Sequence, residues 1–402
     1  MVNNMENKKL IRKEKAEKAI EKTKKLAANA GSFVEETVGG FIERREEAPL
    51  LVGEPTAHVW YRIPVTYGIS GDGTEYHIYI KKACTDNLCI FMSGGGVAWN
   101  EYTAARPVTG AAVASGEPNY YWNNLRPFTQ IMNINVGITD TNQLINPFYD
   151  WNFVIITYTT GDFHVGNSDF PYKALDGSDQ ILHFHGRRNF ECAMDIARNF
   201  FPSPSKLLIA GDSAGAFAVP AVAGRIADEW YPYCNDITLF SDSAQLINDK
   251  WQSIARDVWK SDNSVWQPLS GDNITLDWYR ALLYANPGRF RCLYASSTHD
   301  YLLSAFYNDM TKEIYKTDNA VIRKYYKQLH QMVSELRDLG SDFHFFINDW
   351  KNPLYTKAQL GTIHTAVRLR YFYMRTLKGA TMAAWLRDAV NGKTYDVGTE
   401  LL

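Results

Sequence analysis

Apolar and polar positions along most of the chain follow patterns that predict strands separated by helices. Short apolar or alternating runs predict eight strands, at residues 57–65, 75–81, 88–92, 152–158, 206–210, 237–241, 292–296 and 343–347. Helical spacing fills gaps between them at residues 178–200, 214–228, 311–339 and 365–378. Several of the runs are continuously apolar, which suits parallel strands covered on both faces. The pattern therefore predicts a doubly wound α/β domain with a mostly parallel eight-stranded sheet.

Two connections are longer than the link between a strand and a helix requires. Residues 99–147 follow the third predicted strand, and residues 244–290 follow the sixth. Both are rich in aromatic residues, and the second contains Trp251, Trp259, Trp266 and Trp278. Long loops at the carboxyl ends of parallel strands commonly build substrate pockets. We therefore interpret both segments as cap insertions in one catalytic domain that spans residues 48–402.

The first 47 residues have a different pattern, that of a charged helical arm. Nine Lys or Arg and four Glu residues occupy the first 25 positions, and apolar residues recur at three-to-four spacing as far as Ile42. No compact apolar core follows the basic segment, so the pattern is not that of a signal peptide. We interpret residues 1–47 as an amphipathic helical arm that packs on its own domain or on a second copy. Binding to a membrane or lipid-like surface is the alternative.

The composition limits the classes of binding partner and indicates the cellular compartment of the protein. The 42 Lys and Arg residues nearly balance the 44 Asp and Glu residues, which removes the usual charge argument for nucleic-acid binding. No apolar run approaches the roughly 20 residues that a transmembrane helix needs. Five cysteines in 402 residues are too sparse for a disulfide framework. Together with the missing signal peptide, this count predicts a cytoplasmic protein.

The strongest chemical motif is Gly211-Asp212-Ser213-Ala214-Gly215, between a predicted strand and a predicted helix. In this context Gly-x-Ser-x-Gly is typical of a nucleophile elbow, a turn so tight that only small residues fit beside the serine. The turn exposes the serine oxygen and places a helix N-terminus behind it. We therefore expect Ser213 to be a nucleophile.

Three consecutive glycines, Gly94 to Gly96, follow the third predicted strand. Glycines let the backbone approach a ligand closely and turn its N–H groups inward. An acyl-transfer serine needs such donors for the oxyanion, one from the residue after the nucleophile, here Ala214, and others from this loop. A phosphate cradle fits less well, because no Gly-Lys-Ser/Thr sequence follows the glycines.

The general base and its orienting acid are expected after the serine, with the acid first. His344 lies inside the last predicted strand, whereas His364 lies in the loop beyond it, so His364 is the expected base. Asp300 follows the seventh predicted strand, which is the usual position of the acid. Asp242 follows the sixth strand and is the competitor, although it is also explained as a buried polar group that ties the strand to a loop.

Together these motifs resemble those of the pectin acetylesterase/Notum carboxylesterase family, a branch of the α/β-hydrolases. The resemblance extends over about residues 57–378 and includes the glycine loop with nearby Trp99, the segment 146–154, the stretch 158–166 and the serine elbow. It implies O-deacylation without a metal or an organic cofactor. By matching motifs, it also implies a triad and a set of oxyanion donors, namely Ser213, Asp300 and His364 with Gly95, Gly96 and Ala214.

Some other residues of these motifs match the family pattern, and some differ from it. Asp162 and His164 look like family residues near the substrate pocket, as does Trp99. Extracellular family members carry cysteines at places where this chain has other residues, including Thr159 and Asp212, and Val97 replaces the tryptophan that often follows the glycines. These departures fit a reduced compartment and argue against an intact extracellular polymer as the substrate.

The sequence thus predicts a serine carboxylesterase that removes O-acyl groups, most simply O-acetyl, through an acyl-enzyme. The expected substrate is a small-molecule or oligosaccharide ester, most simply an acetylated carbohydrate. One alternative keeps the triad but acts on a lipid-like or polyester substrate, such as intracellular polyhydroxyalkanoate. An alternative of another class is a catalytically silent binding module on the same fold.

Overall fold

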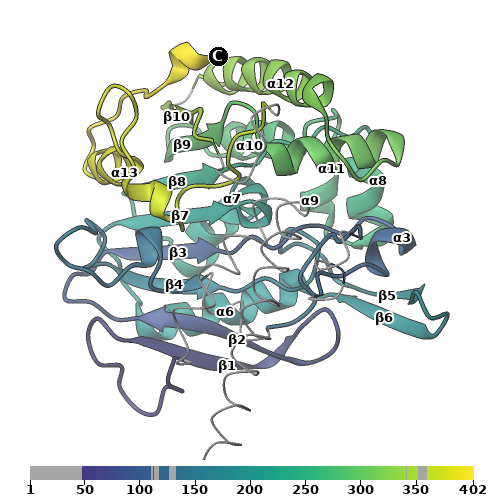
Figure 1. Ribbon diagram of the computed structural model, residues 1–402. Helices are drawn as coiled ribbons and strands as arrows, with labels where there is room; N and C mark the ends of the chain where they lie inside the picture. Colours follow the sequence, from purple (N-terminus) through teal and green to yellow (C-terminus); the bar gives the residue numbers. More distant parts are fainter. Residues whose placement is uncertain (1–47, 110–111, 113–116, 126–132, 341, 352–359) are drawn as a thin grey trace, which may run out of the picture.

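The computed structural model describes residues 48–402, apart from 110–111, 113–116, 126–132, 341 and 352–359. Its centre is an eight-stranded sheet in the order β1-β2-β4-β3-β7-β8-β9-β10, which runs from the bottom to the top of Figure 1. The strands are β1 (Trp60–Ile69), β2 (Glu75–Lys81), β3 (Leu88–Met92), β4 (Asn152–Ile156), β7 (Leu207–Asp212), β8 (Ile237–Asp242), β9 (Phe290–Ser297) and β10 (Phe343–Asn348). The pairs from β4 to β10 are parallel, and β1 and β2 extend the sheet in antiparallel pairing. The predicted fold class is confirmed.

Both faces of the sheet are buried. Successive side chains of a strand point to opposite faces, so each strand contributes to two cores. On β7, Leu207 and Ile209 face one apolar core, whereas Leu208 and Ala210 face the other. The first core includes residues of α6 (Gly186–Phe200), α7 (Ala214–Arg225), α10 (Ile274–Ala285) and α12 (Asn319–Arg337). The second is covered by α13 (Met382–Val390) and by the short helices η1 (Gly137–Thr139) and η4 (Arg370–Tyr373). Figure 1 shows α13 apart from α10 and α12 at the upper end of the sheet.

Three helix predictions differ from the structure. The segment predicted as a helix from residue 178 begins as β6 (Asp179–Phe184), which forms a hairpin with β5 (Ser168–Lys173), and becomes helical only in α6. The helix predicted over 311–339 is divided between α11 (Tyr301–Lys312) and α12, because Glu313 ends α11 in the left-handed region at φ 58°.

The helix predicted over residues 365–378 is absent from that segment except for η4. Thr365 has φ 58°, and the next two amides, those of Ala366 and Val367, donate to the Asp242 carboxylate instead of starting a helical ladder. A side-chain acceptor outside the segment thus replaces the intrahelical partner. Among the described residues, the last α-helix is α13, and only the short helix η5 (Thr399–Leu401) follows it.

The two long insertions contain several helices, and three of the four tryptophans of the second insertion are buried. The first contains α3 (Glu101–Ala104) and η1, and the second contains α8 (Trp251–Ser253), η3 (Ile254–Val258), α9 (Asn263–Trp266) and α10. Trp251 and Trp259 are fully buried, and the Trp259 indole donates to the Ala98 carbonyl over 2.8 Å. The second insertion is therefore fixed to the chain beside the first.

The remaining predictions concern the N-terminal arm, membrane-spanning helices and the cysteines. The expected arm at residues 1–47 lies outside the described residues. Among the described residues, no helix is both long and apolar enough to cross a membrane. All five cysteines are free thiols.

Candidate active site

Ser213 lies in a strained turn between β7 and α7. Its φ of 49° and ψ of −124° are unfavourable for a residue with a side chain, and such strain persists where the surroundings enforce it. A Cβ atom on Gly211 would lie 2.3 Å from the Gly215 carbonyl oxygen, and one on Gly215 would lie 2.0 Å from the Met92 oxygen. The two motif glycines are therefore required by close backbone contacts on both sides of the serine.

His364 and Asp300 form a buried pair at the same edge of the sheet. His364 Nδ1 lies 2.7 Å from Asp300 Oδ2, and the other carboxylate oxygen accepts the Leu303 amide at the start of α11. Both side chains are almost completely buried. The remaining imidazole nitrogen, Nε2, is buried and has no hydrogen-bond partner among the described residues. One imidazole nitrogen is thus fixed and the other is available.

The environment of His364 favours its protonated form. Burial alone would lower the pKa of His364, but the Asp300 carboxylate raises it through both charge and hydrogen bonding, with further contributions from Asp242 and Asp212. The net effect is a pKa above the ordinary histidine value. An imidazole with this environment accepts a proton readily once it is neutral.

The glycine loop lies directly against the elbow. A Cβ atom on Gly94 would approach the Ser213 Cβ to 2.7 Å, and one on Gly96, which has φ 83°, would approach the Tyr120 oxygen to 1.9 Å. Within the described part of the chain, the Gly95, Gly96 and Ala214 amides have no hydrogen-bond partner. Such unpaired N–H groups beside a serine are the donors that an oxyanion requires.

A buried ion pair beneath the elbow was not anticipated from the sequence. Arg368 forms a bidentate pair with Asp212, with Nη2 at 2.8 Å and Nε at 2.9 Å from separate oxygens. Asp212 Oδ1 also accepts the Gly94 amide over 2.8 Å, while Arg368 Nη1 donates to Asn133 and Ser93. The network therefore joins the elbow, the glycine loop and the histidine loop. The available signal was Asp212 itself, since a carboxylate in so tight a buried turn needs a cation.

Asp242, the competing acid, has other partners. Its Oδ2 accepts the Ala366 and Val367 amides over 2.7 and 2.8 Å, and its backbone oxygen accepts the Ser213 amide over 2.9 Å. Burial raises the pKa of Asp242 to about 6 against the opposing effect of these amides. Asp242 thus ties the elbow to the histidine loop, while Asp300 is the carboxylate that contacts the imidazole.

Comparison with models of known protein families identifies the family of the chain. A family model described as Pectinacetylesterase matches residues 68–333, which is most of the described domain. The chain belongs to the pectinacetylesterase family. The matched range contains the glycine loop, the elbow and Asp300, and ends before His364. A search of curated proteins found no match. Family membership suggests a carboxylic ester hydrolase that acts on acetylated carbohydrate.

In this pectinacetylesterase family member, Asp162 and His164 are both buried, and His164 contacts the residue just before the glycine loop. Asp162 accepts hydrogen bonds from the Thr160 hydroxyl and the Gly186 amide, and burial raises its pKa to about 6. Burial lowers the pKa of His164 to about 4, so its imidazole is neutral at pH 7, and Nε2 lies 3.0 Å from the Ser93 oxygen. Both side chains hold backbone segments, and neither lines the cavity described next.

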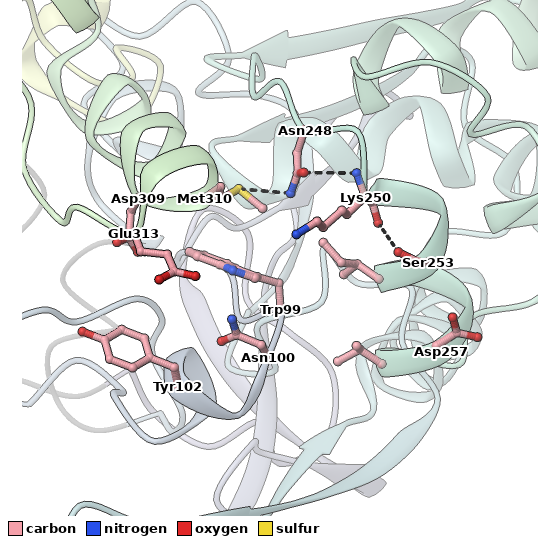
Figure 2. A pocket seen from close by; sticks show the side chains of 12 residues that line it. Trp99, Asn100, Tyr102, Asn248, Lys250, Ser253, Asp257, Asp309, Met310 and Glu313 are labelled. Carbon is pink, nitrogen blue, oxygen red and sulfur yellow. Dashed lines mark hydrogen bonds between the residues drawn. The ribbon is translucent and has the colours of Figure 1, made fainter.

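A cavity of about 710 Å³ opens beside the glycine loop (Figure 2). Trp99 lies near its centre, with Tyr102, Asp309 and Glu313 on one side and Lys250 on another. Ser213 and His364 do not line this cavity. The walls nevertheless come from segments that leave the candidate site, because Trp99 is three residues after Gly96 and α11 begins directly after Asp300.

Proposed function

We propose that this pectinacetylesterase family member is a serine esterase that removes acetyl groups from a carbohydrate through an acyl-enzyme. The observation that supports this most is the unpartnered Nε2 of His364, in a ring whose Nδ1 is bound to Asp300. Serine hydrolysis uses a buried imidazole that a carboxylate orients, and here Asp242 bonds both the Ser213 amide and the amides that follow His364 in the chain.

In the proposed mechanism, Ser213 Oγ attacks the ester carbonyl carbon while His364 Nε2 takes the hydroxyl proton. Asp300 holds the Nδ1 tautomer and stabilises the imidazolium that forms. The amides of Gly95, Gly96 and Ala214 stabilise the oxyanion, and His364 then protonates the departing sugar alcohol. Water next attacks the acetyl-enzyme with His364 again as base, which releases acetate and restores Ser213.

The cavity beside the glycine loop supports a sugar in preference to a long acyl chain. Trp99 and Tyr102 offer aromatic surfaces, while Asn100, Asn248 and Ser253 offer hydrogen-bonding groups at its wall. Apolar acyl pockets are instead lined predominantly by hydrophobic side chains. The lipid or polyester alternative rests on the N-terminal arm, which lies outside the described residues. A cytoplasmic location stays a prediction.

The charge of the cavity suggests which sugar is preferred. Asp309 and Glu313 contribute carboxylates and Lys250 is the opposing cation, whereas Asp257 is paired with Arg256. An excess of acidic groups disfavours a polyanion by like-charge repulsion. We therefore expect a neutral acetylated oligosaccharide to be a better substrate than acetylated galacturonan.

A substrate panel on the purified chain tests this proposal. We expect p-nitrophenyl acetate to be hydrolysed faster than the butyrate and octanoate, and acetylated xylo-oligosaccharide to release more acetate than acetylated galacturonan. The Ser213→Ala variant, with folding checked by circular dichroism, is the control for background hydrolysis. Faster turnover of octanoate would support the lipid alternative, and activity that Ser213→Ala retains would refute the esterase assignment.

A further inference from the structure

Three side chains with metal-binding atoms meet at the amino end of the sheet, away from Ser213. They are His58, in the segment before β1, Cys84, in the turn between β2 and β3, and Asp150, just before β4. Their ligand atoms all lie within 4.8 Å of one another. Ser213, by contrast, follows the carboxyl end of β7, so this cluster lies outside the proposed catalytic machinery.

Two separations within this cluster match the edges of a tetrahedral metal site. His58 Nε2 lies 3.5 Å from Cys84 Sγ and 3.6 Å from Asp150 Oδ1. Around a tetrahedral Zn²⁺ with ordinary bond lengths, the nitrogen–sulfur edge is about 3.5 Å and the nitrogen–oxygen edge about 3.3 Å. Both contacts are made by the same imidazole nitrogen, and all three ligand atoms lie within 4.8 Å of one another, as they must to share one ion.

A second histidine cluster provides a contrast. On the β5–β6 hairpin, His183 Nδ1 and His185 Nε2 lie 2.6 and 2.9 Å from the same oxygen of Asp169. These distances are those of charge-assisted hydrogen bonds and are shorter than the edge of a metal tetrahedron. An ion at this second cluster would have to push the ligands apart, whereas at His58 it would not.

The backbone holds His58 in place for such a role. His58 has φ 62°, a conformation that residues with side chains rarely adopt. Its amide donates to the Lys82 oxygen over 2.7 Å, and its ring stacks on Tyr149 at 4.2 Å with an interplanar angle of 8°. Asp150 Oδ1 is positioned by the Cys84 amide over 2.9 Å.

We propose that His58, Cys84 and Asp150 bind a thiophilic divalent cation of the Zn²⁺ type. On binding, the Cys84 thiol releases its proton to solvent and its sulfur bonds to the metal, with no change in oxidation state. The thiolate and the carboxylate neutralise the two charges of the ion, and the sulfur ligand selects against Mg²⁺ and Ca²⁺. Cys84 is exposed, which leaves a fourth position for water and makes the site open to chelators. The ion would link the segment before β1 to the starts of β3 and β4.

Metal titration of the full chain tests this site independently of esterase activity. We expect one Zn²⁺ equivalent to be bound and to raise the unfolding temperature, and Co²⁺ to give a thiolate charge-transfer band. Cys84→Ser, an exposed substitution of similar size, should lose the band and at least tenfold in affinity, as should His58→Ala. His183→Ala is the matched control and should bind normally. Unchanged binding in Cys84→Ser, or binding lost only in His183→Ala, would overturn the proposal.

Discussion

Two buried charge pairs lie four residues apart on the loop that follows β10. Arg368 and Asp212 form a saturated network, because the guanidinium has carboxylate, amide and hydroxyl acceptors and the carboxylate also binds the glycine loop. His364 and Asp300 form an unsaturated pair, because imidazole Nε2 is buried without a partner among the described residues. The two pairs share a loop and similar burial but differ in what they leave unbound.

The difference in free hydrogen-bonding groups suggests different roles for the two pairs. A buried polar atom without a partner is unfavourable, so it persists where the fold enforces it and where a substrate or nucleophile can bind it. A network with every donor and acceptor occupied offers nothing to a substrate and instead fixes the segments that it joins. This difference supports the proposed role of His364 in proton transfer, whereas the hydrogen bonds of Arg368 hold the loop in place.

Substitution of the two aspartates near His364 should change kcat by very different amounts. Asp300→Asn should lower kcat on p-nitrophenyl acetate by about 10⁴-fold, because an amide at this position favours the wrong imidazole tautomer. Asp242→Asn keeps an oxygen that can accept the Ala366 and Val367 amides, so its kcat should fall far less. Steady-state kinetics on both variants measure the difference. If Asp242→Asn had the larger effect, the acid would be reassigned.

Substitutions in the Arg368–Asp212 pair should affect catalysis less than Asp300→Asn does, but they should lower stability strongly. Arg368→Met leaves the Asp212 carboxylate buried without its cation and should lower the free energy of unfolding by about 3–5 kcal/mol. Adding Asp212→Asn removes that uncompensated charge and should restore part of the loss. Urea denaturation of the wild type, both single variants and the double variant gives the coupling. Additive effects would contradict a direct pair.

Much of this fold was predictable because continuous apolar runs such as 88–92 and 237–241 must be buried on both faces. The elbow serine was placed from the glycines around it, which the structure shows to be in close backbone contact. The backbone conformation near the end of the chain was less predictable, because it depends on hydrogen bonds to side chains that are far away in the sequence. Ala366 and Val367 donate to Asp242, more than 120 residues away, and no local pattern reports that contact.

The same reason explains why Arg368 was missed. Its position near the histidine loop is ordinary in sequence, and its role depends on Asp212, 156 residues earlier. Periodicity reports which residues are buried but not which buried charges meet. The cap role of the second insertion stays a prediction, and its Trp251 and Trp259 lie among the buried residues of the first core.

Labelling by an alkyl fluorophosphonate shows whether Ser213 is the nucleophile. We expect one adduct per chain on the peptide that contains Ser213, and a much slower reaction in the His364→Ala variant. Because Asp300 raises the pKa of His364, the neutral base is lost as the pH falls through that pKa. The labelling rate should therefore decline below a midpoint that lies above the ordinary histidine value of about 6.5. An adduct at another residue would exclude Ser213 as the nucleophile, and an equal rate in His364→Ala would exclude His364 as its base.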